Sequence, residues 1–145
     1  MSDVSITQTK SAVPMGMRRD VGRAMAKEVR DIIYERTMRG VFGPGTDRET
    51  YNPDYARKKG KPLAPVTLRD TGSMLRQMKG IYKFSNEADT ILADIRFQTS
   101  RAEFLADIHN RRGAGRGQIR RRFLFLRQRD ESRIMSAVAA AMMGN

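Results

Sequence analysis

The sequence predicts an α+β fold in which a long N-terminal helix and a C-terminal helix pack on a small antiparallel sheet, with long extended loops. Helical spacing of apolar residues over residues 15–38 and again over residues 130–143 predicts the two helices. Alternation of apolar and polar residues up to Phe97 predicts the sheet. The chain has 145 residues, which is enough for one domain with a real core and too short for two.

The start of the chain differs in character from the rest. Residues 1–14 are polar and β-branched and end at Pro14, so we expect a flexible N-terminal arm that stays disordered until something pairs with it. A single domain over residues 15–145 follows. Its first helix ends at Gly40 and the turn at residues 43–45. The apolar face of this helix consists of Met17, Val21, Met25, Val29, Ile32 and Ile33.

Shorter elements are predicted in the second half of the domain. Asp70 can cap a short helix that ends at Gly80. A strand at residues 81–84 and a clearer one at residues 91–97 predict a hairpin, and residues 101–109 predict one or two helical turns. The residues expected to face inward are Met74, Leu75 and Met78, then Ile91, Ala93, Ile95 and Phe97, then Phe104, Leu105 and Ile108, and finally Ile134, Met135, Val138 and Met142.

Positive charge is the strongest feature of the composition. The chain carries 28 Lys and Arg against 16 Asp and Glu, a net charge of +12, which favours an anionic partner such as nucleic acid or an acidic protein surface. Eight arginines and no acid lie between Asn110 and Arg129. Such like charge destabilises a folded monomer unless a partner or counterions relieve it, so we expect the arginine–glycine loop, residues 110–122, to face outward.

A second candidate contact region is the connecting segment, residues 39–67, which holds four of the five prolines. It is far longer than the usual loop of about 4 to 6 residues, and segments of this kind are normally functional or covered by a neighbouring subunit. Tyr51 and Tyr55 are interleaved there with basic residues. We expect these residues at a partner interface: Arg57, Lys58, Lys59 and Lys61 of the connecting segment, and Arg111, Arg112, Arg116, Arg120, Arg121 and Arg122 of the arginine–glycine loop.

Other chemistries have little support in the sequence. His109 is the one histidine and there is no cysteine, so we expect no metal site and read His109 as a helix-end residue that makes a hydrogen bond. The carboxylates alternate with basic residues on predicted helix surfaces, which is typical of solvated ion pairs and not of a catalytic pair. The glycine clusters lack the Gly-Lys-Ser/Thr ending of a phosphate loop. We therefore expect neither an enzyme nor a cofactor.

Membrane insertion is not expected either. No apolar run approaches the roughly 18 residues that a membrane span requires, and the N-terminus has no apolar signal core. The absence of cysteine fits a reducing compartment. We expect the protein in the cytoplasm, unless it travels inside something larger.

Three stretches, read in order, resemble one known family. The first is residues 53–63, Pro-Asp-Tyr-Ala-Arg-Lys-Lys-Gly-Lys-Pro-Leu, followed by Leu-Arg-Asp-Thr-Gly-Ser-Met-Leu at residues 68–75. The second is the strand pair from Ile81 to Phe97, and the third is Phe-Leu-Ala-Asp-Ile-His-Asn at residues 104–110, followed by a glycine-rich loop and Arg-Phe-Leu at residues 122–124. This order over residues 17–143 resembles the phage virion morphogenesis family, the tail-completion and head-tail joining proteins of tailed bacteriophages.

The resemblance implies a function. It implies a non-enzymatic structural protein of a phage neck or tail end, found in the virion and in the host cytoplasm during assembly. It also implies a homo-oligomeric ring, hexameric by family analogy, that links the tail terminator or tube to the head connector. Asp70, Thr71 and Gly72 match the family's Asp-Thr-Gly and would cap and pack the short helix. The alternative from the residues alone is a nucleic-acid-binding module in which the arginine–glycine loop grips phosphates, and contact with packaged DNA stays open.

Overall fold

The computed structural model describes residues 5–9, 13, 15–48, 50–64, 66, 73–85, 90–114 and 117–144. The chain forms two compact units, each assembled from segments far apart in the sequence. The first unit combines residues 1–32, 78–96 and 126–145, and the second combines residues 33–77 and 97–125. The single domain expected over residues 15–145 stays a prediction.

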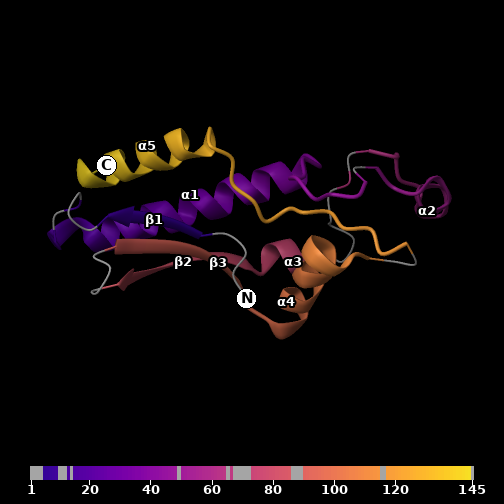
Figure 1. The fold of residues 1–145 in the computed structure, drawn as a ribbon, viewed down its shortest axis with the longest axis horizontal. Coiled ribbons are helices and arrows are strands. Elements are labelled where there is room, and N and C mark those ends of the chain that lie inside the picture. The colour runs from indigo at the N-terminus through magenta and orange to yellow at the C-terminus, as the bar shows by residue number, and fades with distance from the viewer. Residues whose placement is uncertain are drawn as a thin grey trace. The chain divides into compact units, whose positions relative to one another are not determined.

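The first unit contains the predicted helices and sheet, so the α+β fold class is confirmed (Figure 1). The sheet has the strand order β1-β3-β2, and the bond network places β3 between its two neighbours. Its elements are β1 (Ser5–Thr9), η2 (Met15–Met17), the first part of α1 (Arg18–Met38), β2 (Met78–Ser85), β3 (Thr90–Phe97) and α5 (Asp130–Met142).

Helix α1 packs on strand β2 through glycine. A Cβ added at Gly80 would lie 2.1 Å from the backbone oxygen of Ala26, and one added at Gly22 would lie 2.5 Å from the ring of Tyr82. Only glycine allows so close an approach of helix and strand. The predicted role of Gly80 as a helix stop is therefore wrong, because Gly80 lies inside β2. Met78, expected on the same short helix, is the first residue of this strand.

The apolar face of α1 is buried as predicted, and so is the inner face of β3. Val21, Met25 and Val29 are at most 1% exposed. Ile91, Ala93 and Ile95 of β3 are also buried, which confirms the alternation read from the sequence. Between them, Asp94 is buried as well, and its carboxylate accepts a hydrogen bond from the Ile95 amide and lies 3.4 Å from the Arg96 guanidinium. β3 is therefore covered on both faces at this position.

Residues 5–9 have regular structure, whereas the sequence led us to expect an arm without it. They pair antiparallel with β3, with Ser5 opposite Asp94 and Thr9 opposite Thr90. The Ser-Ile-Thr-Gln-Thr sequence of β1 suits a strand, since Ile and Thr favour the pleated conformation. The local sequence does not show which strand residues 5–9 pair with. In the structure the pairing strand is β3 of the same chain.

Helix α5 lies alongside α1 in this unit, and Arg133 donates a hydrogen bond to Glu28 across the contact (Figure 1). Ile134 and Val138 are buried as predicted. Met135 is 43% exposed, so its predicted inward position is wrong. A helix whose buried stripe is this narrow has room for residues 134 and 138, spaced by four, and not for their neighbour.

The second unit is built of short helices and extended segments. Its core includes Phe123, which is 1% exposed and meets Phe97 edge-on at 6.4 Å between ring centroids. Phe104 is 54% exposed, so its predicted inward position is wrong; the small residues Ala102 and Ala106 face the interior instead. The elements are α2 (Pro53–Lys59), α3 (Ser73–Arg76), α4 (Ser100–Asp107) and a π-helix, η3 (Ile108–Arg112).

Candidate interaction surface of the second unit

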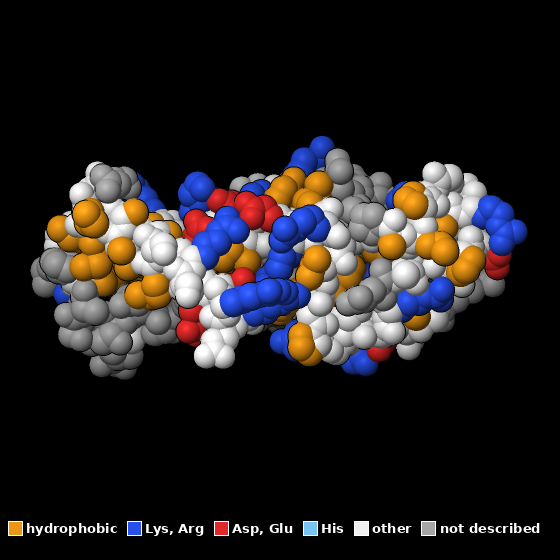
Figure 2. All heavy atoms as spheres, turned by 90° about the horizontal axis from the view of Figure 1, so that it is seen from above, with side chains coloured by type: hydrophobic (Ala, Val, Ile, Leu, Met, Phe, Trp, Pro, Cys, Tyr) orange, Lys and Arg blue, Asp and Glu red, His pale blue; other side chains and the backbone are white. Residues whose placement is uncertain are grey.

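Most of the net positive charge belongs to the second unit. Its sequence holds 16 Lys and Arg against 7 Asp and Glu, a net charge of +9, whereas the first unit holds 12 against 9. Both predicted contact regions, the connecting segment and the arginine–glycine loop, lie in this unit. On the face of the whole molecule that Figure 2 shows, Lys and Arg side chains cover more of the surface than acidic side chains do. The second unit is therefore where an anionic partner is attracted most strongly.

The two predicted contact regions are bound to each other, which the sequence did not indicate. The amide of Gly43 donates to the carbonyl of Arg122, and the amide of Asp47 donates to the carbonyl of Arg120, both at 2.8 Å. Side chains repeat the pattern, because the amides of Arg120 and Arg122 donate to Asp47 and to Thr46, respectively, at 2.9 Å. We call this ladder of bonds, between residues 43–47 and residues 120–122, the clasp.

Asp47 joins the clasp to the charge of the loop. The guanidinium of Arg120 donates to both carboxylate oxygens of Asp47, at 3.1 and 3.2 Å. These hydrogen bonds, with the bond from the Arg120 amide, lower the pKa of Asp47 below its usual value. Two-point geometry of this kind fixes the orientation of the guanidinium as well as its distance. Arg120 is thus held in place while nearly half of its side chain stays exposed.

Arg111 and Arg112 share one carboxylate. Their Nε atoms lie 2.6 and 2.7 Å from the two oxygens of Asp107, whose side chain is almost fully buried. Both guanidinium groups are more than half exposed. Two cations on one carboxylate leave a surplus positive charge at the surface. Both arginines therefore have a partner within the chain, although the pairing neutralises only part of their charge.

Arg121 lies inside the unit, although we predicted it at an interface. It is 8% exposed, and its Nη2 donates to the carbonyl of Thr50 at 2.9 Å. Its guanidinium also lies 5.7 Å from the ring centroid of Tyr51, within the range of a cation–π contact. The reason is the alternation of an extended segment: Arg120 and Arg122 point to solvent, so the side chain between them points inward.

Helix α2 presents the basic residues of the connecting segment. Its N-terminus is capped by the Asn52 side chain, which accepts a hydrogen bond from the backbone amide of Asp54. Gly60 in the left-handed conformation ends the helix. Arg57, Lys58 and Lys59 lie in its last turn and are exposed. Cations at this position interact favourably with the dipole of the helix. Arg57 pairs with Asp54 at 3.1 Å, and both side chains are more than three-quarters exposed, so this pair contributes little to stability.

Lys61 behaves differently from the lysines of α2. Its ammonium lies 5.3 Å from the ring centroid of Tyr51 and 5.9 Å from that of Tyr55. The two rings are tilted against each other with centroids 5.4 Å apart. Lys61 therefore lies against the rings of Tyr51 and Tyr55, and Arg121 lies against the ring of Tyr51, so cations of the same chain already contact both rings.

His109 lies in the π-helix η3. Here the amide of Gly113 donates to the carbonyl of Ile108 at 2.6 Å, five residues back, which is the π-helical bond. The His109 carbonyl accepts from the Arg121 amide at 2.7 Å, but Nδ1 of the ring is buried and has no partner among the described residues. The predicted ring hydrogen bond is thus not found at Nδ1. Burial, with the charge of Arg121 nearby, lowers the pKa of the ring.

Some predicted residues cannot be placed. Arg116 of the loop and the expected cap residues Asp70, Thr71 and Gly72 lie outside the residues that the structure describes. Within the described ranges, no cluster of three or more His, Asp or Glu side chains could hold a metal ion. None of the helices in those ranges is both long and apolar enough to cross a bilayer.

Comparison with known proteins adds nothing to these observations: no family model, curated sequence or solved structure matches the chain.

Proposed function

We propose that this chain is a structural, non-catalytic subunit of the neck or tail end of a tailed bacteriophage. In this role it forms a homo-oligomeric ring, with six subunits by family analogy, that joins the tail terminator or tube to the head connector. The ordered resemblance over residues 17–143 motivates the proposal. The observation that carries it is the clasp, because it holds two long basic segments together with the charges of Arg120 and Arg122 exposed.

The physical argument starts from the surplus charge. A unit in which Arg111 and Arg112 share one carboxylate, and in which α2 carries further exposed cations, repels itself at low salt. Repetition of this surface around a ring raises the repulsion unless acidic groups of an adjoining ring cover it. Arginine suits that contact better than lysine, because its planar fork can bind a carboxylate at two points. The clasp fixes the backbone beforehand, so less conformational entropy is lost on assembly.

The competing function is a nucleic-acid-binding module. Proteins that bind single strands combine basic grooves with aromatic side chains on which bases stack. The aromatic side chains of the basic region, Tyr51 and Tyr55, are in contact with Lys61 and Arg121 of the same chain. A base would have to displace these cations in order to stack. This arrangement favours an acidic protein partner over a nucleic acid.

The proposal is tested by the oligomeric state and by DNA binding of the purified full chain. Size-exclusion chromatography with light scattering measures the mass at several concentrations, and electron microscopy of the resulting particles counts the subunits. Anisotropy titrations with duplex and single-stranded DNA, from 0.05 to 0.3 M salt, measure affinity and its salt slope. We expect a discrete ring whose mass does not depend on DNA and DNA affinity no tighter than roughly micromolar near 0.15 M salt, as for non-specific binding.

Two outcomes would overturn the proposal. A chain that stays monomeric up to roughly 0.1 mM and enters no larger particle when its phage neighbours are co-expressed is not a ring subunit. Nanomolar DNA binding near 0.15 M salt with a steep salt slope would assign the surface to nucleic acid instead. The variant Lys58→Glu, Lys59→Glu, Arg122→Glu then tests the contact, because it reverses three exposed charges of the two basic segments and leaves the ion pairs of Arg112 and Arg120 in place.

A further inference from the structure

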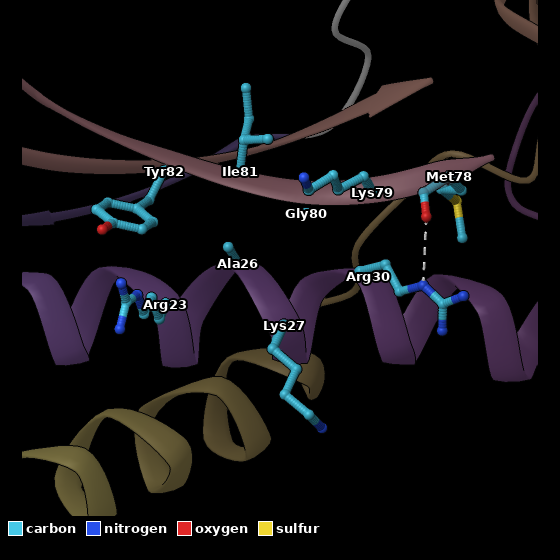
Figure 3. A pocket seen from close by; sticks show the side chains of 9 residues that line it. All are labelled: Arg23, Ala26, Lys27, Arg30, Met78, Lys79, Gly80, Ile81 and Tyr82. Atoms are coloured by element: carbon cyan, nitrogen blue, oxygen red, sulfur yellow. Dashed lines mark hydrogen bonds between the residues drawn. The ribbon is translucent and has the colours of Figure 1, made fainter. Parts of the chain in front are cut away.

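A pocket in the first unit is separate from the surface described above. It has a volume of about 640 Å³ and lies between α1 and β2 (Figure 3). Four of its lining side chains are cations and none is acidic. The lining residues are Arg23, Ala26, Lys27, Arg30, Met78, Lys79, Gly80, Ile81 and Tyr82.

The pocket follows the edge of a strand. Five consecutive residues of β2, from Met78 to Tyr82, line it, although alternate side chains of a strand point to opposite faces of the sheet. A pocket over one face of the sheet would be lined by every second residue of the strand. The lining by consecutive residues therefore indicates that this pocket runs along the backbone of β2. Among the strands that the structure describes, in the order β1-β3-β2, β2 has a neighbour on one side only. The other edge therefore offers backbone N–H and C=O groups to an added strand.

The helix beside this edge supplies the charge. Arg23 and Lys27 of α1 and Lys79 of β2 line the pocket and are exposed, and in Figure 3 the Lys27 side chain extends from α1 on the side away from β2. Asp31 lies next to the pocket and binds Lys27 at 2.6 Å and Arg30 at 3.3 Å. Glu28 also acts on Lys27, so the four cations of the lining stand against at least two neighbouring carboxylates and leave a smaller positive surplus.

Two side chains limit what can bind. The guanidinium of Arg30 lies 3.5 Å from the carbonyl of Met78, as the dashed line in Figure 3 shows, so one end of the edge is already in contact with α1. Tyr82 at the other end of the lining stretch is half-buried and adds an apolar surface. The span between them suits a few residues of extended chain that pair with residues 79–82 and carry acidic side chains toward α1.

We propose that this pocket binds an extended acidic segment of a partner protein, which adds to the sheet as a strand beside β2. The backbone edge gives the affinity that does not depend on sequence, and Arg23, Lys27 and Lys79 select acidic side chains. The proposal is independent of ring formation, since it concerns the first unit alone. The simpler explanation is that Lys79 and Lys83 only prevent the edge of β2 from pairing with other chains, as lysines on edge strands often do.

The test uses the full chain and a fluorescent ten-residue peptide of alternating Glu and Val, read by anisotropy at 0.05 and 0.15 M salt. Two control peptides separate charge from strand addition: one has Lys in place of Glu, and one has methyl groups on alternate backbone nitrogens, which blocks pairing. We expect saturable binding of the Glu peptide alone. Hydrogen exchange should then slow at alternate amides within residues 79–82, those that face away from β3, because these amides gain partners.

The variant Arg23→Glu, Lys27→Glu, Lys79→Glu should weaken binding of the Glu peptide by roughly tenfold or more, since several exposed charge contacts are reversed together. These side chains are exposed, so the fold should persist, and circular dichroism checks this. The matched control, Arg57→Glu, Lys58→Glu, Lys59→Glu, makes the same charge change on α2 and should leave the affinity within about twofold, apart from a long-range effect that salt screens. Equal weakening by both triple variants, equal binding of the methylated peptide, or no binding of any peptide would each overturn the proposal.

Discussion

The close approach of α1 and β2 makes a quantitative prediction at Gly80. An alanine Cβ at this position would lie 2.1 Å from the Ala26 oxygen and 2.6 Å from its carbonyl carbon, both of them backbone atoms. Because backbone atoms cannot rotate aside, helix and strand must separate by about 1.3 Å to restore an ordinary contact near 3.4 Å. Overpacking usually costs about 1–3 kcal/mol, and we expect Gly80→Ala at the upper end, near 3 kcal/mol. That corresponds to a fall in Tm of roughly 6–12 °C.

Urea unfolding followed by circular dichroism at 222 nm measures the effect, with Gly16→Ala as the control. An added Cβ at Gly16 meets nothing within 4 Å, so the free energy of unfolding should change by no more than about 0.5 kcal/mol. Gly22→Ala should fall between the two, since its clash is with the ring of Tyr82, which can shift, and alanine gains about 1 kcal/mol in helix propensity. If Gly80→Ala proved as stable as the wild type, the helix–strand packing described here would be refuted.

Three further predictions follow from the second unit. Phe123→Ala should destabilise the protein by about 3–5 kcal/mol in urea unfolding, whereas Phe104→Ala should cost under about 1 kcal/mol because its ring is half exposed; similar losses would contradict their opposite placement. The pKa of Asp47, followed by carboxyl NMR, should lie below 3.8 and return toward that value in Arg120→Gln, and no change on substitution would exclude the ion pair. The pKa of His109 lies below 6.5 in the folded chain, so the unfolded chain takes up the proton first; the free energy of unfolding should fall as pH drops below about 6.5, and this part of the fall should be missing in His109→Gln.

The sequence predicted the elements whose signal is local. The apolar period of α1 runs over more than four turns, and residues 91, 93 and 95 alternate cleanly, so both elements were located to within three residues. Gly80 misled the prediction, because a glycine near the end of a helical pattern normally signals a stop. Its actual cause is the Ala26 backbone, more than fifty residues earlier, and nothing in the local sequence indicates it.

The candidate surface was predicted in composition but not in structure. Asp107 and Arg111 are four residues apart, so their ion pair could have been read from the sequence as a helical i,i+4 contact. Asp47 and Arg120 are 73 residues apart, and only the fold brings them together. The same holds for Arg121: a run of three arginines does not show that alternation along an extended segment turns the middle one inward.

The division of charge between the two units has a consequence for assembly. If the clasped surface meets an acidic ring and the β2 pocket takes an acidic strand, the two contacts use different residues, and their energies should add, as they do for sites that share no partners. Charge reversal at Lys58, Lys59 and Arg122 should then leave peptide binding intact, and reversal around the pocket should leave ring mass intact. The result would differ if the protein only attracted polyanions through its net charge. Each charge-reversal variant would then weaken both interactions, in proportion to the net charge that it removes. Peptide affinity and ring mass should therefore be measured on both triple variants. The two measurements distinguish two specific binding sites from a general attraction by net charge, whichever partner each site binds.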